Sequence, residues 1–201
     1  YLSSYLAMGV TWIIGCYYVT EHASDTTLNL HIVIVFSVLM RGFFLPTEPS
    51  LSDDIYRYIW DGQIQQQGIN PYIYSPDNTK TAFLRQQSEI YEYINNKSIQ
   101  TVYPPLMQMF FLSVTTISTN LIWMKLAFVT VDMLLLFLLS KLLRSLNLSS
   151  VRALIYGWCP LVIVEIAGSG HNDVVASLLL LAAIFAIRSK RGYTAITLLS
   201  L

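Results

Sequence analysis

The sequence is poor in charge and in cysteine, and its basic residues form no long cluster. Only 12% of the 201 residues are charged and the formal net charge is zero. The two cysteines, Cys16 and Cys159, have neither CxxC nor Cys/His metal spacing, and both lie in apolar segments, where they act as small hydrophobic residues. A Gly-rich loop of the kind that cradles nucleotide phosphates is also missing. These absences argue against a nucleic-acid partner and against a nucleotide-sugar donor.

The sequence is rich in long apolar segments, and 54% of its residues are hydrophobic. A helix needs about 20 apolar residues to cross the hydrocarbon core of a bilayer. The pattern therefore predicts an all-α fold, a polytopic transmembrane helix bundle embedded in a lipid bilayer. The predicted spans are 1–20, 28–46, 121–143, 152–168 and 172–188, and a further span begins at 192–201.

The ends of the chain predict that it is part of something longer. It opens at Tyr1 without an initiator Met, and it stops at Leu201 inside an apolar run. We therefore expect residues 1–201 to be a fragment, a single transmembrane domain that forms the N-terminal part of a longer module. The missing C-terminal part could contribute to function.

Basic residues collect in the short cytoplasmic loops of membrane proteins, and here they define two such loops. The loop between them, "AGSGHND", has no Lys or Arg, so we predict that it lies on the outer face. The first basic loop holds Lys141, Arg144 and Arg152, and the second holds Arg188, Lys190 and Arg191.

The segment 103–118 decides where the long loop before it lies. If the segment spans the membrane, that loop is cytoplasmic, and if it does not, residues 47–120 form one extracytoplasmic loop with juxtamembrane helices. Charge alone does not choose, because a loop of this length escapes the positive-inside rule. The opening "YPP" and the polar tail of the segment favour the second alternative.

Two helices are predicted inside this loop. The first runs from Ser52, as N-cap, to a stop at Gly68, and it places Asp53, Arg57 and Asp61 on one stripe at i, i+4 and i+8. A second polar helix is predicted over residues 79–96. Together they would form an amphipathic cap on the bundle.

Six motifs carry a resemblance to a known family: "SDDIYRYIWDG", "GINPY", "YPPL", "MKLAFVTVD", "WCPL" and "EIAGSGHND". In this order and spacing, over about residues 38–190, the chain resembles the bacterial polyprenyl-phosphate-mannose-dependent mannosyltransferases. More loosely, it resembles the eukaryotic glycosylphosphatidylinositol mannosyltransferase. Both belong to the C-type glycosyltransferase (GT-C) superfamily, and several motifs in register are more specific than any one alone.

The resemblance implies an integral membrane enzyme of glycolipid biosynthesis. It implies transfer of a sugar, mannose by preference, from a polyprenyl-phosphate donor to a hydroxyl of a glycan or glycolipid acceptor. The enzyme would sit in the bacterial cytoplasmic (inner) membrane with its active site on the extracytoplasmic face. In that superfamily a catalytic carboxylate lies in the first large extracytoplasmic loop, and a second acidic motif follows two spans later on the same face.

The chemistry of such a transfer needs a general base at the acceptor hydroxyl and a cation for the departing phosphate. Asp53 or Asp54 is the predicted catalytic base, and Arg57 could hold the phosphate or orient the carboxylate. Ser-Asp-Asp is also a plain capping pattern, and the resemblance favours catalysis over capping. Asp61 is included among the substrate-binding candidates, although a structural role fits it as well.

The motif "GHND" supplies the second set of candidates. His171, Asn172 and Asp173 could bind donor phosphate, sugar hydroxyls or a divalent cation, and the alternative is an N-cap by Asn172. Whether a metal is used stays open. Glu165 is a candidate because it is an ionisable residue in an apolar run, and Tyr103 of "YPP" completes the substrate-binding set.

Charged residues within the other predicted spans have two readings. Lys125 and Asp132 share one helix face, and Arg41 lies near the outer end of its span. Each is either an interhelical partner or a ligand-binding group. Two alternatives to an enzyme also stay open: a transporter or lipid flippase, with polar residues near the membrane midplane, and a non-catalytic assembly subunit.

Overall fold

The computed structural model describes residues 2–22 and 27–200, and this part of the chain is helical and contains no strand. The predicted all-α class is therefore confirmed. The longer helices are α1 (Leu2–His22), α2 (Thr27–Phe44), α3 (Asp54–Gln66), α5 (Pro105–Ile117), α6 (Leu121–Ser145), α9 (Asp173–Arg188) and α10 (Gly192–Leu199). The short elements are η1 (Thr79–Thr81), α4 (Ala82–Arg85), η2 (Glu89–Tyr93), η3 (Ser150–Ala153), α7 (Leu154–Gly157), α8 (Pro160–Ile163) and the π-helical turn η4 (Val164–Ser169).

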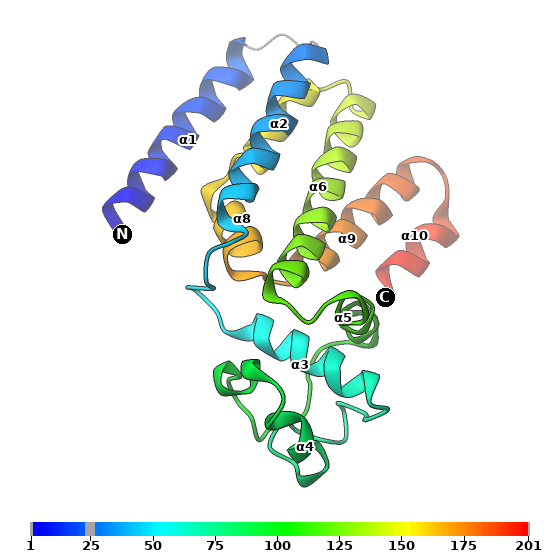
Figure 1. Cartoon of the computed structure of the whole chain (residues 1–201). Coiled ribbons are helices and arrows are strands. Elements are labelled where there is room, and N and C mark those ends of the chain that lie inside the picture. The colour runs from blue at the N-terminus through cyan, green and yellow to red at the C-terminus, as the bar shows by residue number, and fades with distance from the viewer. Residues whose placement is uncertain (1, 23–26, 201) are drawn as a thin grey trace.

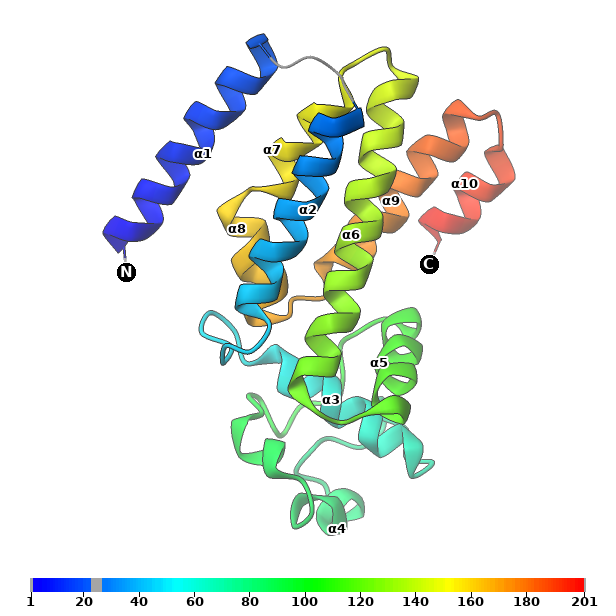
Figure 2. The same ribbon diagram turned by 45° about the horizontal axis from the view of Figure 1, so that its top comes forward.

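The helices form a bundle with a cap at one end (Figure 1). Helices α1, α2, α6 and α9 run along the bundle, while α3 crosses beneath the ends of α2 and α6 with α5 beside it and α4 farther out. The connections from α6 to η3 and from α9 to α10 lie at the opposite end (Figure 2). The Arg188 guanidinium donates to the backbone oxygen of Ser145 (2.8 Å) and joins these two connections. The two basic loops of the sequence thus share the end of the molecule away from the cap.

Within the described residues, one helix is long and apolar enough to cross a membrane, and it is α6. A second span is added if the pair Ser150–Gly157 and Pro160–Ser169, bent by 60°, is counted as one broken span. Helix α9 has 16 residues, which rise about 24 Å and fall short of the hydrocarbon core of about 30 Å. The polytopic character of the bundle therefore stays a prediction.

Helix α5 has the length of a helix that does not cross. Its 13 residues rise about 20 Å, and it packs against α3 rather than extending the bundle. The crossing is close at Gly62, where a Cβ atom would lie 2.4 Å from Thr115 Oγ1 and 2.7 Å from the backbone oxygen of Phe111. Only glycine fits there, so the sequence itself fixes how near the two helices approach.

The predicted helix over residues 79–96 was wrong, since this stretch contains the three short elements η1, α4 and η2. Ser88 is extended (φ −111°, ψ 108°) and interrupts it. The Arg85 Nε group donates to the backbone oxygen of Pro76 (3.0 Å), and buried Leu84 and Ile94 anchor the stretch to the core. Side-chain bonds to the backbone have replaced the continuous helical ladder here.

Charged residues inside the bundle are paired between elements. Arg41 of α2 forms a buried ion pair with Asp132 of α6, and the Tyr156 hydroxyl donates to the same carboxylate. The Lys125 ammonium donates to the backbone oxygen of Thr47 (2.5 Å). Of the two readings of these charges, the structure shows interhelical and helix-to-loop contacts.

The placement of the two ends predicts a labelling pattern. In a variant without Cys16 and Cys159, a cysteine introduced by Thr79→Cys in the cap should react with an impermeant maleimide in intact cells. A cysteine introduced by Ser145→Cys at the opposite end should react only after permeabilisation, because basic connections stay in the cytoplasm. The reverse pattern would invert the orientation, and reaction of both positions in intact cells would contradict a membrane-spanning bundle.

Candidate active site

The first turn of α3 presents two carboxylates in different surroundings. The helix begins one residue later than predicted, with Asp53 at the N-cap position, and Ser52 Oγ accepts the N–H of Asp54 (3.2 Å). Asp53 is exposed and its side chain makes no capping hydrogen bond. Asp54 is half-buried and accepts a hydrogen bond from Asn95 Nδ2 (3.2 Å). The more accessible of the two carboxylates is therefore that of Asp53. Its side chain does not form the capping hydrogen bond that the Ser-Asp-Asp pattern suggested.

Asp53 lines a polar cavity of about 910 Å³ between the cap and the bundle. The cavity lies where the link from α2 to α3, one face of α3, the stretch around η2 and the turn from α5 to α6 meet. Its size falls within the range of small-molecule sites. The lining residues include Glu48, Asp53, Tyr56, Gln63, Glu89 and Tyr93.

On its other side, Asp54 lies near a pair of tyrosines, of which Tyr58 is buried and Tyr103 is half-buried. The rings of Tyr58 and Tyr103 meet edge to face, with centroids 4.9 Å apart. Burial, followed by the negative charge of Asp54, raises the pKa of Tyr103 to about 12. Burial likewise raises the pKa of Tyr58, and the charges of Asp54 and Asp173 act in the same direction. Both hydroxyls therefore stay protonated near neutral pH.

The "GHND" loop reaches the same turn of α3. Gly170 has a left-handed backbone (φ +77°), and a Cβ atom there would lie 2.4 Å from Cδ1 of Ile55. Both the backbone angle and the space require glycine. The loop after η4 thus packs on the residue next to Asp54, so the structure brings the two predicted halves of the site together.

His171 lies between two carboxylates. Its Nε2 is 3.2 Å from Glu165 Oε2, and its Nδ1 is 3.7 Å from Asp173 Oδ2. Glu165 belongs to the π-helical turn η4, a distortion that is frequent at functional sites. Asn172 occupies the N-cap position of α9, but its side chain makes no capping hydrogen bond. The alternative role of Asn172 as a side-chain cap is therefore not what the structure shows.

The donor set around His171 does not fit a metal centre. No group of three or more His, Cys, Asp or Glu side chains in residues 2–22 and 27–200 is arranged to hold an ion.

Arg57 and Asp61 form a buried pair inside the cap. The Arg57 Nε donates to Asp61 Oδ1 (2.8 Å), and both side chains are almost fully buried. The second oxygen of Asp61 accepts from Gln108 Nε2 of α5 (2.9 Å), which also contacts Thr101 Oγ1 (2.8 Å). Gln65 Nε2 donates to Gln108 Oε1 (2.8 Å). The Nε of Arg57 is therefore bonded to Asp61, whereas its Nη2 is buried without a hydrogen-bond partner. Both alternatives for Arg57, orienting the carboxylate and holding a phosphate, stay predictions.

Gln108 and Thr101 were not found from the sequence. A signal was present, because Gln108 interrupts the apolar run "LMQMFF" and a buried amide needs partners. Its partners came from residues far away in the chain, and their identity could not be read from spacing.

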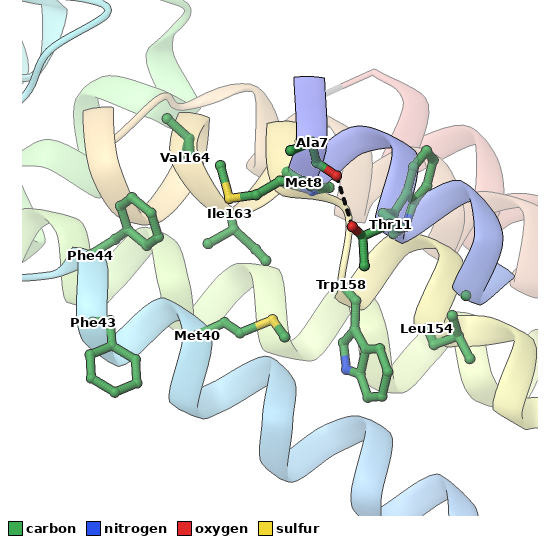
Figure 3. Close-up of a pocket in the computed structure, with 13 residues that line it drawn as sticks. Ala7, Met8, Thr11, Met40, Phe43, Phe44, Leu154, Trp158, Ile163 and Val164 are labelled. Atoms are coloured by element: carbon green, nitrogen blue, oxygen red, sulfur yellow. Dashed lines mark hydrogen bonds between the residues drawn. The ribbon is translucent and has the colours of Figure 1, made fainter. Parts of the chain in front are cut away.

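A second cavity, of about 710 Å³, lies between α1, α2 and the α7–α8 pair (Figure 3). Three of its lining residues have a side-chain N–H or O–H group, and each of these groups donates to a backbone oxygen. Thr11 donates to Ala7 (2.8 Å), Trp12 to Ile155 (3.1 Å) and Trp158 to Val33 (3.1 Å). The other lining residues are Ala7, Met8, Gly15, Met40, Phe43, Phe44, Leu154, Pro160, Ile163 and Val164. The cavity therefore presents an apolar lining.

The family model of the alpha-(1->6)-mannopyranosyltransferase N-terminal domain matches residues 2–201. The chain belongs to this family. It is therefore a mannosyltransferase of the GT-C type, and the resemblance carried by the six motifs is confirmed. Neither the curated proteins nor the solved structures contain a significant match to the chain.

The buried pair in the cap of this mannosyltransferase predicts a stability experiment. Asp61→Leu leaves the Arg57 guanidinium buried without its partner and should lower the free energy of unfolding by about 3–5 kcal/mol. The double variant Arg57→Met, Asp61→Leu removes both charges and should recover most of this loss. Denaturant titration of the purified protein measures both effects, and an Asp61→Leu variant as stable as the wild type would contradict the role of the pair.

Proposed function

We propose that this protein is a polytopic integral membrane mannosyltransferase that uses a polyprenyl-phosphate mannose donor and a glycan or glycolipid acceptor. The observation that carries the proposal is the accessible carboxylate of Asp53 in a polar cavity beside an apolar one. Family membership supports the mannosyl transfer. The lipid donor and the membrane setting rest on the arguments that follow.

The apolar cavity supports a donor with a hydrocarbon chain. A lining whose polar hydrogens are already bonded favours burial of an apolar ligand, at about 25 cal/mol per Å² of apolar surface. Phe44 lines this cavity and the next residue, Leu45, lines the polar one, so the two cavities lie on either side of the end of α2. A lipid chain in the first would place its phosphate close to the candidate residues.

In the proposed reaction, an acceptor hydroxyl oxygen attacks C1 of the donor mannose. The bond from C1 to the phosphate oxygen breaks, the polyprenyl phosphate leaves with the bonding electrons, and Asp53 takes the hydroxyl proton. Tyr103, Glu165, His171, Asn172 and Asp173 would contact the donor sugar or phosphate from the "GHND" side. Arg57 and Asp61 would orient the turn that carries Asp53.

The membrane setting is supported by the arrangement of charge. The spanning helix α6 and the bent pair run between the cap and the basic connections, and this fits a cap on the extracytoplasmic face of a bacterial inner membrane. Residues 47–120 would then form the extracytoplasmic loop. Arg41, Asp132 and Lys125 are bonded to protein groups, whereas a transporter or flippase would use such charges to line a path.

The decisive experiment separates catalysis from capping and from an inactive subunit. In the full-length enzyme, Asp53→Asn should lower the transfer rate by about a hundredfold or more, because an amide cannot accept the proton. Asp54→Asn should cost less, because its amide oxygen still accepts from Asn95. The measurement is transfer of radiolabelled mannose from polyprenyl-phosphate mannose.

Folding of each variant is checked by circular dichroism and by membrane insertion. A larger loss in Asp54→Asn would assign the base to Asp54. Near-normal transfer by the double variant would exclude both carboxylates as the base.

A further inference from the structure

The charged residues that line the polar cavity are all acidic. Three carboxylates, those of Glu48, Asp53 and Glu89, line it, and no Lys, Arg or His is among its lining residues within the described chain. Such a lining repels an anionic phosphate. Carboxylates only accept hydrogen bonds, and sugar hydroxyls are donors, so the lining suits a neutral polyhydroxylated ligand.

The cavity also has an aromatic surface. The rings of Tyr56 and Tyr93 are stacked with centroids 5.0 Å apart, and Tyr56 is 8% exposed. Tyr93 is 61% exposed, so its ring stays accessible to a ligand. The negative face of an aromatic ring attracts the C–H groups of a ligand, and the apolar face of a sugar ring presents such groups.

Amide and hydroxyl groups complete the lining. Gln63 Oε1 accepts from Ser88 Oγ (3.0 Å), which ties the stretch around η2 to α3 and leaves the amide nitrogen of Gln63 as a donor. The Tyr56 hydroxyl contacts Glu48 Oε2 at 3.4 Å and ties the link before α3 to the same face. The cavity walls are therefore joined to the helix that carries Asp53.

We propose that this cavity is the acceptor subsite and that it binds the terminal sugar of a neutral saccharide. The sugar ring packs on Tyr93, its hydroxyls donate to Glu48 and Glu89, and the reacting hydroxyl faces Asp53. The inference rests on the proposed function and adds to it the surface that recognises the acceptor. The phosphate of the donor is excluded from this cavity by charge.

The test uses the full-length enzyme, a polyprenyl-phosphate mannose donor and, as acceptor, an octyl glycoside of an alpha-(1->6)-linked mannose disaccharide. Tyr93→Ala should raise the acceptor KM by about five- to tenfold and leave the donor KM unchanged, because it removes the surface on which the acceptor sugar stacks and no proposed donor contact. Tyr93→Phe keeps the ring and should match the wild type. Phe83→Ala is the matched control, since Phe83 is an exposed aromatic residue of the same loop outside the cavity.

A second variant, Glu89→Gln, guards against a folding defect in Tyr93→Ala. It removes a charge from an exposed side chain and should also raise the acceptor KM selectively. Calorimetric binding of the disaccharide glycoside without donor gives a readout that does not need turnover. A wild type that binds the glycoside through Tyr93 but transfers no mannose would refute the proposed function and keep the saccharide site. Acceptor KM and binding unchanged in both variants would overturn the inference.

Discussion

The buried carboxylate of Asp61 is the contact on which the cap depends. It accepts from Arg57 within α3 and from Gln108 of α5, and so it joins the two helices. An ionised group with no exposed surface is stable only when its oxygens are bonded, and here both are. Beside it, Gly62 lets α5 approach closely. This contact fixes the axis of α3, and the direction in which Asp53 points follows from that axis.

Local patterns in the sequence predicted α3 well because its signals are local. The i, i+4 spacing put Arg57 and Asp61 on one stripe, and Gly68 ends the helix in a left-handed conformation (φ +72°). The same kind of reasoning failed for residues 79–96. Polar composition and helix propensity are weak predictors of a helix, because tertiary contacts override them. Here side-chain hydrogen bonds to the backbone, such as that of Arg85, decide the conformation.

The meeting of the two halves of the site could be expected only from topology. The absence of basic residues from "GHND" placed it at the same face as the cap, but no pattern indicated that Gly170 would pack on Ile55. The separate surroundings of Asp53 and Asp54 were also out of reach, because they depend on Asn95 and on the walls of a cavity built from four segments. Long-range packing of this kind has no signature in residue spacing.

The two cavities divide the proposed reaction by chemistry. One has an apolar lining with its polar hydrogens bonded to the backbone, and the other has carboxylates and an open aromatic ring. Both reach the end of α2, since Phe44 lines the apolar cavity and the next residue, Leu45, lines the polar one. In the ribbon, α3 follows this end of α2 and lies across the end of the bundle (Figure 1). A reaction between a lipid-linked sugar and the hydroxyl of a polar acceptor needs such a boundary between an apolar and a polar cavity. The lipid chain of the donor stays in apolar surroundings and the acceptor stays in polar ones while their reacting atoms come together. Helix α3, which lies across the end of the bundle, supplies the exposed carboxylate of Asp53 on the polar side, and α9, which runs along the bundle, begins there with the exposed carboxylate of Asp173. A carboxylate farther along such a helix would lie in an apolar environment that disfavours its charged form.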